Sequence, residues 1–542
     1  FVFGFVVVRL PAMFGAAFLI LGLFSVPTAS LTLLHGLEFP DLQVKSLLAG
    51  CKGFQCVQQY VGLEDSHYSW EVQSQIQGRS EENNVSWTGH VLNMTSQQWL
   101  TAGETSQEVW RHPLTVIVPD NLKAAGQSWT TLLIGGSGAG TPVQEHDGDV
   151  SAAIHLATRT GLRVAVVGLV SQPMSFAADP SGLMRDEEAI KAFSWRNFLD
   201  HPDRPELPIE LPILKAVVRA MDTVTAFTNG TALQFITTGC SKRGLAAVMA
   251  GAYDERVKAI APCCTSLDSA QSIRWATQAM GSETSMAGLK DYVGNGIPDF
   301  LDSPQADLLF GEIDPIWYVD RLKKPQLWLS VGRDDFFMVD HTRAFWDRLP
   351  SGVPKLLSVD GNLPHIGKLS KSPQFMNAID NFVTSIVFDV ELPVLKWSID
   401  NVTGIIHAQQ ISGARPRSVN MWQATTCGAV GRRDFRLFTL DPPGVCSKCG
   451  IFAGGKCSKL MGGNYASRPL TAAADGSWQA SVAAPAEGSF TAFFIEFEFD
   501  GIVASATPAE TWALTTEASV VPVAYPNPPC HGSGCHVSKL GL

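Results

Sequence analysis

Residues Phe235–Met249 read FITTGCSKRGLAAVM and are the most informative part of the sequence. Apolar and β-branched residues run into a Gly-x-Ser turn at Gly239–Ser241, and a helical pattern with small residues on its packing face follows at once. This order is typical of a nucleophile elbow, in which a strained turn lifts the serine hydroxyl above the carboxyl end of a sheet. Such elbows usually have glycine two residues after the serine, whereas here Arg243 stands there and Gly244 follows. A plain strand–helix turn is the alternative that the pattern alone leaves open.

Short apolar runs alternate with helical patterns from about residue 110 to residue 390. The runs are β-branched or aromatic and are bounded by Gly or Pro, which is typical of buried parallel strands. They are LTVIVP, TTLLIGG, RVAVVGLV, LQFITTG, VKAIAP, PQLWLSVG and PKLLSVDG. With helices between them, they predict a doubly wound, mostly parallel α/β sheet within 50–390. The Gly-, Asp- and Pro-bearing stretch at about 271–316 predicts an inserted cap or long loop near the active-site face.

The pattern of the sequence changes after Leu392. Helical periodicity ends, and alternating segments such as FTAFFIEFEFDG and TWALTTEASVVPV appear with turn residues between them. Alternation is typical of strands with one buried face, so this part predicts a β-sandwich domain over 392–526. The remaining residues, 527–542, are predicted to form a flexible tail.

An elbow serine needs a base and an acid that orients the base, and α/β-hydrolases supply them in the chain order serine, acid, histidine. Asp334 follows the strand PQLWLSVG and His365 follows the strand PKLLSVDG, so both lie on loops after strands, where such a sheet places catalytic groups. We therefore predict a catalytic triad of Ser241, Asp334 and His365. Neighbouring residues compete for the acid and base positions: Asp335, Asp340 and His341.

Backbone N–H groups are expected to hold the oxyanion of such a reaction. The N–H of Lys242, directly after the serine, is one donor by position, and its side chain either adds positive charge there or is solvated. The glycine-rich turn at 134–138 is expected to provide the second donor, from Gly136 or Ser137. A phosphate-binding loop is disfavoured because no Lys-Ser or Lys-Thr pair follows this turn. The sequence predicts no cofactor and no metal ion.

Composition and charge narrow the possible classes of function. The chain of 542 residues is 45% hydrophobic and 17% charged, which excludes disorder as its main state. Its net charge is −11 and no block of Lys or Arg offsets the acidic residues, so no nucleic-acid partner is expected. A small-molecule or peptide substrate is the expected partner of the candidate site.

The first thirty residues predict export of the protein. Residues 14–26 form an apolar run with the length of a signal-peptide core, and the small residues Thr28, Ala29 and Ser30 follow where a signal peptidase cuts. Residues 1–30 are therefore interpreted as a signal peptide, with an uncleaved N-terminal membrane anchor as the alternative. In both cases the protein is expected outside the cytosol, either secreted or held at the membrane by this segment.

Sequons and cysteines agree with export. Four Asn-x-Ser/Thr sequons are candidate glycosylation sites: Asn84, Asn93, Asn229 and Asn401. The eleven cysteines cluster locally, as disulfides in an oxidising compartment often do. The disulfide candidates are Cys51, Cys56, Cys240, Cys263, Cys264, Cys446, Cys449, Cys457, Cys530 and Cys535. Zinc is the alternative for the last two groups, but neither shows two short knuckles at the usual spacing, so disulfides are favoured.

One disulfide is predicted beside the elbow. Cys240 ends the elbow strand, and Cys263 and Cys264 end the next strand, VKAIAP. Adjacent parallel strands bring these ends within disulfide reach, so Cys240 is predicted to bond Cys263 or Cys264. The odd number of cysteines leaves at least one thiol free.

A set of short motifs carries a family resemblance. They are, in order, MTSQQW (94–99), VWRHPLTVIVP (109–119), LLIGGSG, SWRNFL, VRAMD (218–222), TGCSKRG, VKAIAP, GRDDFF (332–337) and RRDFR (432–436). With these motifs the chain resembles the PhoPQ-activated pathogenicity-related protein family, which includes bacterial envelope-associated members and the secreted autocrine proliferation repressor proteins of social amoebae. GCSKRG, with Arg at the second position after the serine, is that family's own form of the elbow.

The resemblance implies an α/β-hydrolase domain followed by an Ig-like β-sandwich. It carries Ser241, Asp334 and His365 onto the family's presumed triad and implies no substrate. The Gly-Cys-Ser-basic elbow is also similar to that of glucuronoyl esterases, which tie the cysteine before the serine to one beside the catalytic histidine. No cysteine lies near His365 in the sequence, which weakens that parallel.

The sequence leaves two classes of function open. The first is an exported serine hydrolase, of esterase or peptidase type, in which Ser241 attacks an ester or amide carbonyl. The second is a secreted signalling or binding protein of the autocrine proliferation repressor type, which keeps the hydrolase fold as a scaffold.

Overall fold

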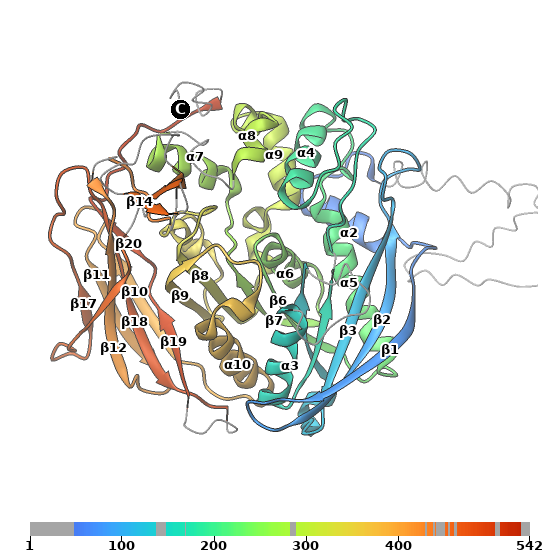
Figure 1. Cartoon of the computed structure of the whole chain (residues 1–542), viewed down its shortest axis with the longest axis horizontal. Coiled ribbons are helices and arrows are strands. Elements are labelled where there is room, and N and C mark those ends of the chain that lie inside the picture. The colour runs from blue at the N-terminus through green and yellow to red at the C-terminus, as the bar shows by residue number, and fades with distance from the viewer. Residues whose placement is uncertain are drawn as a thin grey trace, which may run out of the picture.

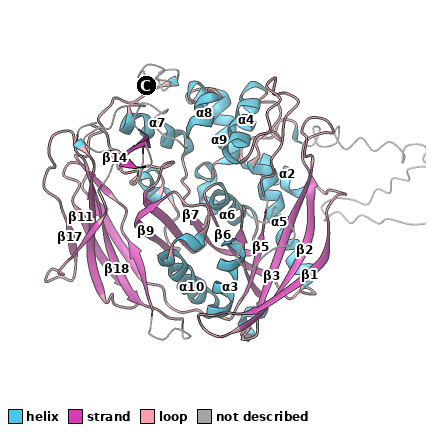
Figure 2. Ribbon diagram, viewed as in Figure 1, coloured by secondary structure: helices cyan, strands magenta, loops and turns pink. Residues whose placement is uncertain are grey.

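The computed structural model shows a central sheet with helices on both faces and a group of smaller sheets beside it (Figures 1 and 2). The structure describes residues 48–136, 148–168, 170–281, 289–428, 431–436, 439–440, 450–453, 456–459, 463–503 and 510–532. Several predicted features lie outside these residues: the leader at 1–30, Ser137, Cys446, Cys449 and Cys535. For Cys457 only the backbone is described. Within the described ranges, no helix has the length and apolar character needed to cross a membrane.

The central sheet has nine strands in the order β1-β2-β3-β5-β4-β6-β7-β8-β9. Their bounds are β1 (Ser69–Arg79), β2 (Ser86–Gln98), β3 (Val109–Pro119), β4 (Trp129–Ile134), β5 (Arg163–Val167), β6 (Gln234–Cys240), β7 (Val257–Cys263), β8 (Gln326–Arg333) and β9 (Lys355–Pro364). From β5 to β9 in this order the strands pair in parallel, whereas β1, β2 and β3 pair antiparallel and β3 also runs antiparallel to β5. The prediction of a mostly parallel α/β sheet is confirmed.

The run LTVIVP, predicted as a buried parallel strand, instead belongs to the antiparallel strand β3. Much of β3 is enclosed, and Val116 and Ile117 have no exposed surface. A strand buried on both faces is a continuous apolar run whatever its direction, so this pattern identifies the strand without identifying its pairing.

Two helical layers enclose the sheet because successive side chains of a strand point to opposite faces. In β4, Leu132 and Ile134 share a core with α2, α5 and α6, whereas Leu133 belongs to the core that includes α3 and α10. The bounds of these helices are α2 (Phe54–Gly62), α3 (Gly148–Thr160), α5 (Glu210–Phe227), α6 (Lys242–Tyr253) and α10 (Pro373–Phe388). Helices on both faces are what a doubly wound fold requires.

The order in which the chain adds strands to the sheet reverses at β4. From β4 it passes to β5 on one side, and β6 then pairs with β4 on the other side. In open α/β sheets, binding sites form in the crevice outside the carboxyl ends of the strands at such a reversal. Gly135 and Gly136 follow β4, and Ser241 follows β6, so both predicted glycine-rich turns lie at this point.

The stretch predicted as a cap or long loop, about 271–316, is helical in its described residues. Its helices are α7 (Ser269–Met280), α8 (Lys290–Gly294) and α9 (Pro304–Ile313). They share a separate core with α4 (Glu187–Asp200), in which the Trp195 ring contacts the rings of Tyr292 and Phe310 edge to face. The four helices lie together at one end of the sheet (Figure 1).

After residue 392 the described chain forms three antiparallel sheets. The first has the order β10-β11-β17, the second β16-β12-β18-β19 with β20 also paired to β18, and the third β13-β15-β14. The bounds are β10 (Val394–Ile399), β11 (Ile406–Ser412), β12 (Ser418–Thr425), β13 (Thr439–Leu440), β14 (Gly450–Ala453), β15 (Lys456–Lys459), β16 (Ala466–Pro469), β17 (Trp478–Ala480), β18 (Thr491–Asp500), β19 (Thr511–Thr515) and β20 (Ser519–Val521). The first two sheets share a core in which Trp478 meets Phe497 edge to face at 5.3 Å. An Ig-like arrangement of these sheets stays a prediction.

The first residues of the predicted flexible tail are held against the insert. Asn527 donates from its backbone N and from Nδ2 to the carbonyl oxygen of Gln278 in α7, at 3.2 and 3.0 Å. Gly532 N donates to the Asp302 carboxylate, and Cys530 is buried in the core of the insert. Residues 527–532 are therefore part of the packed structure and not of a free tail.

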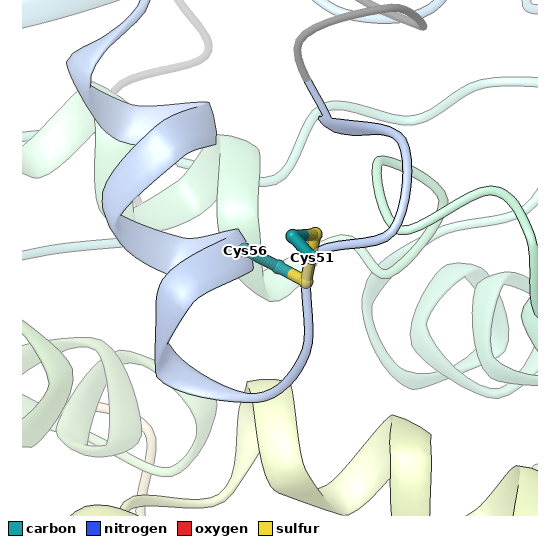
Figure 3. The surroundings of a disulfide bond; sticks show 2 residues. All are labelled: Cys51 and Cys56. Atoms are coloured by element: carbon teal, nitrogen blue, oxygen red, sulfur yellow. A yellow bond between two sulfur atoms is a disulfide. The ribbon is translucent and has the colours of Figure 1, made fainter.

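Cys51 and Cys56, both candidates in a set whose pairing the sequence left open, form a disulfide at the start of α2, with Cα atoms 5.2 Å apart (Figure 3). Cys530 is also disulfide-bonded. So is Cys427, which was not among the candidates. These bonds fit an oxidising compartment.

The predicted disulfide from Cys240 is wrong, because Cys240, Cys263 and Cys264 are free, buried thiols. Cys240 and Cys263 are register partners on β6 and β7, as expected. The sulfur of Cys263 lies 3.6 Å from that of Cys264, which is a contact between thiols and not a bond. The strand ends are adjacent, but adjacency alone does not make the bond.

The four sequon asparagines differ in exposure. Asn84, Asn229 and Asn401 are exposed, as glycan attachment requires. Asn93 is half-buried within β2. Glycosylation at these residues stays a prediction.

Candidate functional site

Ser241 occupies the turn between β6 and α6 with φ 61° and ψ −131°. A residue other than glycine in this region of φ/ψ space costs on the order of 1–3 kcal/mol, so surrounding contacts must hold it there. The Ser241 N–H donates to the carbonyl oxygen of Cys263 at 2.8 Å, and its own carbonyl oxygen accepts from Leu245 N at 3.1 Å. The turn is therefore the strained elbow that the sequence predicts, fixed by backbone hydrogen bonds on both sides.

Two glycines let the strand and helix of the elbow approach closely. A Cβ at Gly239 would lie 2.9 Å from the carbonyl oxygens of Arg243 and Ile134. A Cβ at Gly244 would lie 2.8 Å from the carbonyl oxygen of Cys263 and 2.9 Å from that of Gly239. Gly244, three residues after the serine, thus provides the close approach that glycine gives one residue earlier in the usual pattern. This explains why Arg243 is tolerated at that earlier position.

Asp334 and His365 form a buried pair on the loops after β8 and β9. The Nδ1 atom of His365 lies 2.9 Å from Oδ2 and 3.0 Å from Oδ1 of Asp334. Asp334 Oδ1 also accepts hydrogen bonds from the backbone N–H groups of Phe336 and Phe337, at 2.7 and 3.1 Å. The carboxylate is therefore fixed by its own loop, and it in turn fixes one nitrogen of the imidazole.

The electrostatic setting of His365 follows from this pair. Burial favours the neutral ring, but the charge of Asp334 and its hydrogen bond outweigh burial and raise the pKa of His365 to about 9. The other ring nitrogen, Nε2, is buried and has no hydrogen-bond partner among the described residues. A buried polar atom without a partner is rare, and at a site of this kind it is available to a reacting group.

The competing acid and base candidates have other partners. Asp340 forms a buried ion pair with Arg433 from the C-terminal region. Both ring nitrogens of His341 face backbone carbonyl oxygens, at 2.8 and 3.3 Å, and burial lowers its pKa. Asp335 is half-buried and has no hydrogen bond with His365. The pair at Asp334 and His365 is thus the one that these loops assemble.

A cavity lies at the elbow and reaches the loop that follows Asp334. Ser241 lines it, and so does Phe336, whose ring centroid lies 4.4 Å from that of His365. Its apolar wall comes from α4, the insert and the loop after β8: Trp195, Ile273, Leu289, Tyr292, Phe336 and Phe337. No hydrogen bond joins Ser241 to His365 in this structure, and such bonds are often long before substrate binds and tighten in the complex.

The predicted oxyanion donors have different outcomes. Lys242 N begins α6, where the first N–H groups of a helix have no acceptor within the helix, so this donor is available. Gly136 N instead donates to the Asp149 carboxylate at 3.2 Å. A Cβ at Gly136 would also lie 2.0 Å from Arg243 Nη2, so the absence of a side chain here leaves room for the Arg243 guanidinium to pack against the turn. Gly136 is therefore not a free donor here, and Ser137 lies outside the described residues.

The basic side chains after the serine are paired, and neither is solvated. Lys242 Nζ lies 3.0 Å from Glu188 Oε1 and also contacts Glu187, while Arg243 Nη2 lies 2.8 Å from Glu187 Oε1. Tyr292 donates to the second oxygen of Glu188. Burial disfavours the charged carboxylate, but nearby lysine charge lowers the pKa of Glu188 to about 2. These contacts connect the start of α4 to the start of α6. They also pair the positive charges of Lys242 and Arg243 with the negative charges of Glu187 and Glu188.

Cys264, which follows β7, lies beside the acid–base pair. Its Sγ, a carboxylate oxygen of Asp334 and a ring nitrogen of His365 all lie within 4.8 Å of one another. The expectation that no cysteine lies near His365 is thus wrong, because Cys264 is distant in sequence but close to His365 in the folded chain. Parallel strands β7, β8 and β9 end at the same edge of the sheet, which brings residues far apart in the chain together.

The C-terminal region contacts both loops of the pair. Tyr465 donates from Oη to the carbonyl oxygen of Gly332 at 3.4 Å, just before Asp334 in the chain. Its backbone exchanges two hydrogen bonds with the side chain of Asn362, at 2.9 and 3.1 Å, just before His365. Arg433 pairs with Asp340 farther along the first loop. These contacts support the loops from outside the sheet.

Comparison with known proteins places this arrangement in a family. The sequence model of the PhoPQ-activated pathogenicity-related protein family matches residues 57–436. The chain belongs to this family. The PhoPQ-related match includes the elbow, both loops of the Asp334–His365 pair and the segment with Arg433, and it ends before Tyr465. The resemblance that the motifs carried is confirmed.

Two kinds of relative are similar to this PhoPQ-related protein. Autocrine proliferation repressor protein A of Dictyostelium discoideum is 29% identical over 485 residues, which cover 87% of this chain and 91% of that protein. An acetyl xylan esterase from Paenibacillus sp. R4 has a TM-score of 0.43 and 13% identity, covering 64% of this chain and 99% of that one. A glucuronoyl esterase from Solibacter usitatus has a TM-score of 0.37 and 12% identity, covering 65% and 92%. Structural likeness of this size supports no inference about substrate.

Sequence reasoning missed the acidic partners of the elbow in this PhoPQ-related chain. Glu187 and Glu188 stand in the segment DEEAIKAF, where acidic residues at a helix start are expected for their effect on the helix dipole. Their contacts with Lys242 and Arg243 join segments far apart in the chain. The signal available was a pair of opposite charges at two helix starts, and only the fold brings them together.

Proposed function

We propose that the protein is an exported serine hydrolase that cleaves an ester or amide bond. Ser241 is the nucleophile, His365 the general base and Asp334 the residue that orients His365. The observation that carries the proposal is the buried Asp334–His365 pair with a free Nε2, beside a cavity lined by a serine in a positive-φ elbow. These are the parts that triad chemistry requires.

The reaction follows from these positions. His365 Nε2 takes the proton of Ser241 Oγ as Oγ attacks the carbonyl carbon, and the carbonyl oxygen becomes an oxyanion beside Lys242 N–H. The bond to the leaving group then breaks, and the leaving group takes the proton from His365. A water molecule hydrolyses the acyl-enzyme by the same route, with His365 again as base. Asp334 keeps Nδ1 as the donor nitrogen, so that Nε2 is the atom that accepts the proton.

The cavity supports a substrate whose reacting end is apolar. Aromatic and aliphatic side chains share its wall with four serines and a threonine, and its lysines are paired, Lys242 with Glu188 and Lys191 with Glu210. An unpaired charge on the substrate would find no free partner among the described side chains of this wall, and burying it would cost several kcal/mol, roughly. A small-molecule ester or a peptide segment with an apolar side chain fits these conditions.

Export is supported by the disulfides. Cys51 and Cys56 form a disulfide with each other, and Cys427 and Cys530 each take part in a disulfide. Structural disulfides are rare in a reducing cytosol, so they favour a secreted or extracytoplasmic location. Exposed sequons at Asn84, Asn229 and Asn401 agree with this location.

The test is covalent labelling and ester hydrolysis by the purified full chain. A fluorophosphonate probe and a series of p-nitrophenyl esters should react with the wild type. Ser241→Ala should lose both reactions, by at least about 10³-fold in rate. Ser266→Ala is the matched control, because Ser266 lines the same cavity away from the elbow. Equal labelling of wild type and Ser241→Ala would reject the proposal.

A second candidate function is a secreted signalling or binding protein. The relative named autocrine proliferation repressor protein A, 29% identical over most of both chains, favours it. The discriminating measurement adds wild type or Ser241→Ala protein to responsive cells and compares proliferation. A full effect from Ser241→Ala would show that signalling does not need the serine, whereas loss of the effect would join it to catalysis.

A further inference from the structure

Three side chains with metal-binding atoms meet beside the candidate catalytic centre. The Sγ of Cys264, a carboxylate oxygen of Asp334 and a ring nitrogen of His365 lie within 4.8 Å of one another. The proposed reaction uses Asp334 and His365 but has no role for the thiol. All three side chains are at least nine-tenths buried, and the His365 nitrogen Nε2 has no partner among the described residues.

The backbone holds Cys264 firmly at this place. Its φ is 45°, which is uncommon for a residue with a side chain and requires support from its surroundings. Its N–H donates to the carbonyl oxygen of Leu329 in β8 at 2.8 Å, which ties the end of β7 to the neighbouring strand. The cluster is therefore organised by three adjacent strand ends, which is the rigidity that a metal site needs.

The donor set fits zinc. Thiolate, imidazole and carboxylate are the ligands that zinc takes in proteins, at about 2.0–2.3 Å, so ligand atoms around one tetrahedral ion lie roughly 3.3–3.8 Å apart. His365 Nδ1 and Asp334 Oδ2 are already 2.9 Å apart. Shifts of an ångström or less therefore bring all three atoms to bonding distance. Magnesium and calcium prefer oxygen ligands alone, so the sulfur selects zinc over these ions.

We propose that Zn²⁺ binds to Cys264 Sγ, His365 Nδ1 and an oxygen of Asp334, and that this switches off the catalytic centre. The ion takes the place of the proton that Nδ1 shares with Asp334, and the thiol gives up its proton to solvent as the Zn–S bond forms. The displaced Nδ1 proton is taken up by Nε2, so the ring stays neutral with its one proton on Nε2. With Nε2 protonated and Nδ1 bound to the metal, His365 has no lone pair to accept the proton of Ser241.

Binding is tested without any activity assay, by calorimetric titration of Zn²⁺ into the full chain. The wild type should bind one more equivalent than Cys264→Ala, with Mg²⁺ giving no comparable signal. Cys263→Ala is the matched control, because Cys263 is the adjacent buried thiol outside the cluster, and it should bind as the wild type does. Identical titrations of wild type and Cys264→Ala would overturn the proposal.

A second measurement uses the wild type alone, so that it does not depend on the folding of a variant. Zn²⁺ should slow alkylation of Cys264 by iodoacetamide at least tenfold relative to Cys240, as followed by peptide mass spectrometry. Equal protection of both thiols, or of neither, would contradict a site at Cys264.

The inhibitory effect rests on the proposed function and is tested separately. Saturating Zn²⁺ should reduce fluorophosphonate labelling of the wild type at least tenfold, EDTA should restore it, and the ratio with and without zinc should stay near one in Cys264→Ala. Unchanged labelling at saturating zinc would overturn inhibition. No labelling even without zinc would reject the hydrolase proposal instead, and the titration would still decide the zinc site.

Discussion

The two halves of the candidate site are held in different ways. The nucleophile half is the β6–α6 elbow with Ser241, and the acid–base half is the pair of loops that carry Asp334 and His365. Backbone hydrogen bonds and two glycines within the sheet domain fix the elbow. The acid–base loops also depend on side chains from the C-terminal region, above all Arg433 and Tyr465.

The two parts of the molecule therefore contribute to the candidate site in different ways. The sheet alone is sufficient to present a serine, because a strand, a tight turn and a helix are consecutive in the chain. Asp334 is held by its own loop, and side chains from the C-terminal region contact the two loops from outside the sheet. The C-terminal region therefore contributes to the acid–base half of the candidate site, and damage to either half should have distinct consequences.

The largest effect is expected from Asp334→Asn in the acid–base half. We expect kcat/KM for a p-nitrophenyl ester to fall about 10⁴-fold. An Asn amide can donate to Nδ1, which leaves the ring proton on Nε2, the atom that must accept the proton of Ser241. Asp335→Asn is the control, since Asp335 is adjacent in sequence and makes no hydrogen bond with His365. A loss below tenfold in Asp334→Asn would contradict the role of Asp334 in orienting His365.

The pH dependence should report the same pair. His365 must be neutral to act as a base, and its pKa is raised to about 9, so activity should rise with pH through that value. Between pH 7 and pH 9 the neutral fraction grows about 50-fold. In Asp334→Asn the charge that raises the pKa is lost, so this limb should move to lower pH. A profile that is flat above pH 7 in the wild type would contradict the raised pKa.

A smaller effect is expected when support from the C-terminal region is removed. Arg433→Gln leaves the buried Asp340 with only the more distant Arg343, at 3.9 Å, as a charged partner, which should lower the free energy of unfolding by about 3 kcal/mol. It should also lower kcat about tenfold with little change in KM, because the loop of Asp334 loses its anchor while the cavity is unchanged. Arg417→Gln is the control, since its pair with Asp500 is exposed and contributes under about 1 kcal/mol. Denaturation curves and steady-state kinetics of both variants test this.

The smallest effect is expected in the nucleophile half. Glu188→Gln removes the charge that pairs with Lys242 but keeps an acceptor for Tyr292. Because backbone contacts hold the elbow, the labelling rate should change less than about threefold. A loss as large as that of Arg433→Gln would show that the two halves are supported alike.

The sequence was sufficient for the parts of the site that local patterns encode. Strand, turn and helix at Ser241 are consecutive, and Asp334 and His365 each follow a recognisable strand. The order of these residues along the chain predicted that one edge of the sheet would bring them together.

Features that depend on contacts between distant segments were beyond the sequence. Nothing local shows that Asp149 takes the N–H of Gly136, or that Cys264 comes to lie beside His365 instead of bonding Cys240. The antiparallel pairing of β3 was missed for the same reason, since burial patterns carry no information on strand direction.

Identifying the residue that a fluorophosphonate modifies tests directly whether Ser241 is the nucleophile. The labelled wild-type chain is digested, and tandem mass spectrometry locates the adduct. The account predicts a single adduct on Ser241 that is absent from His365→Ala. An adduct on another serine of the cavity, such as Ser266, or undiminished modification of Ser241 without the histidine, would contradict it.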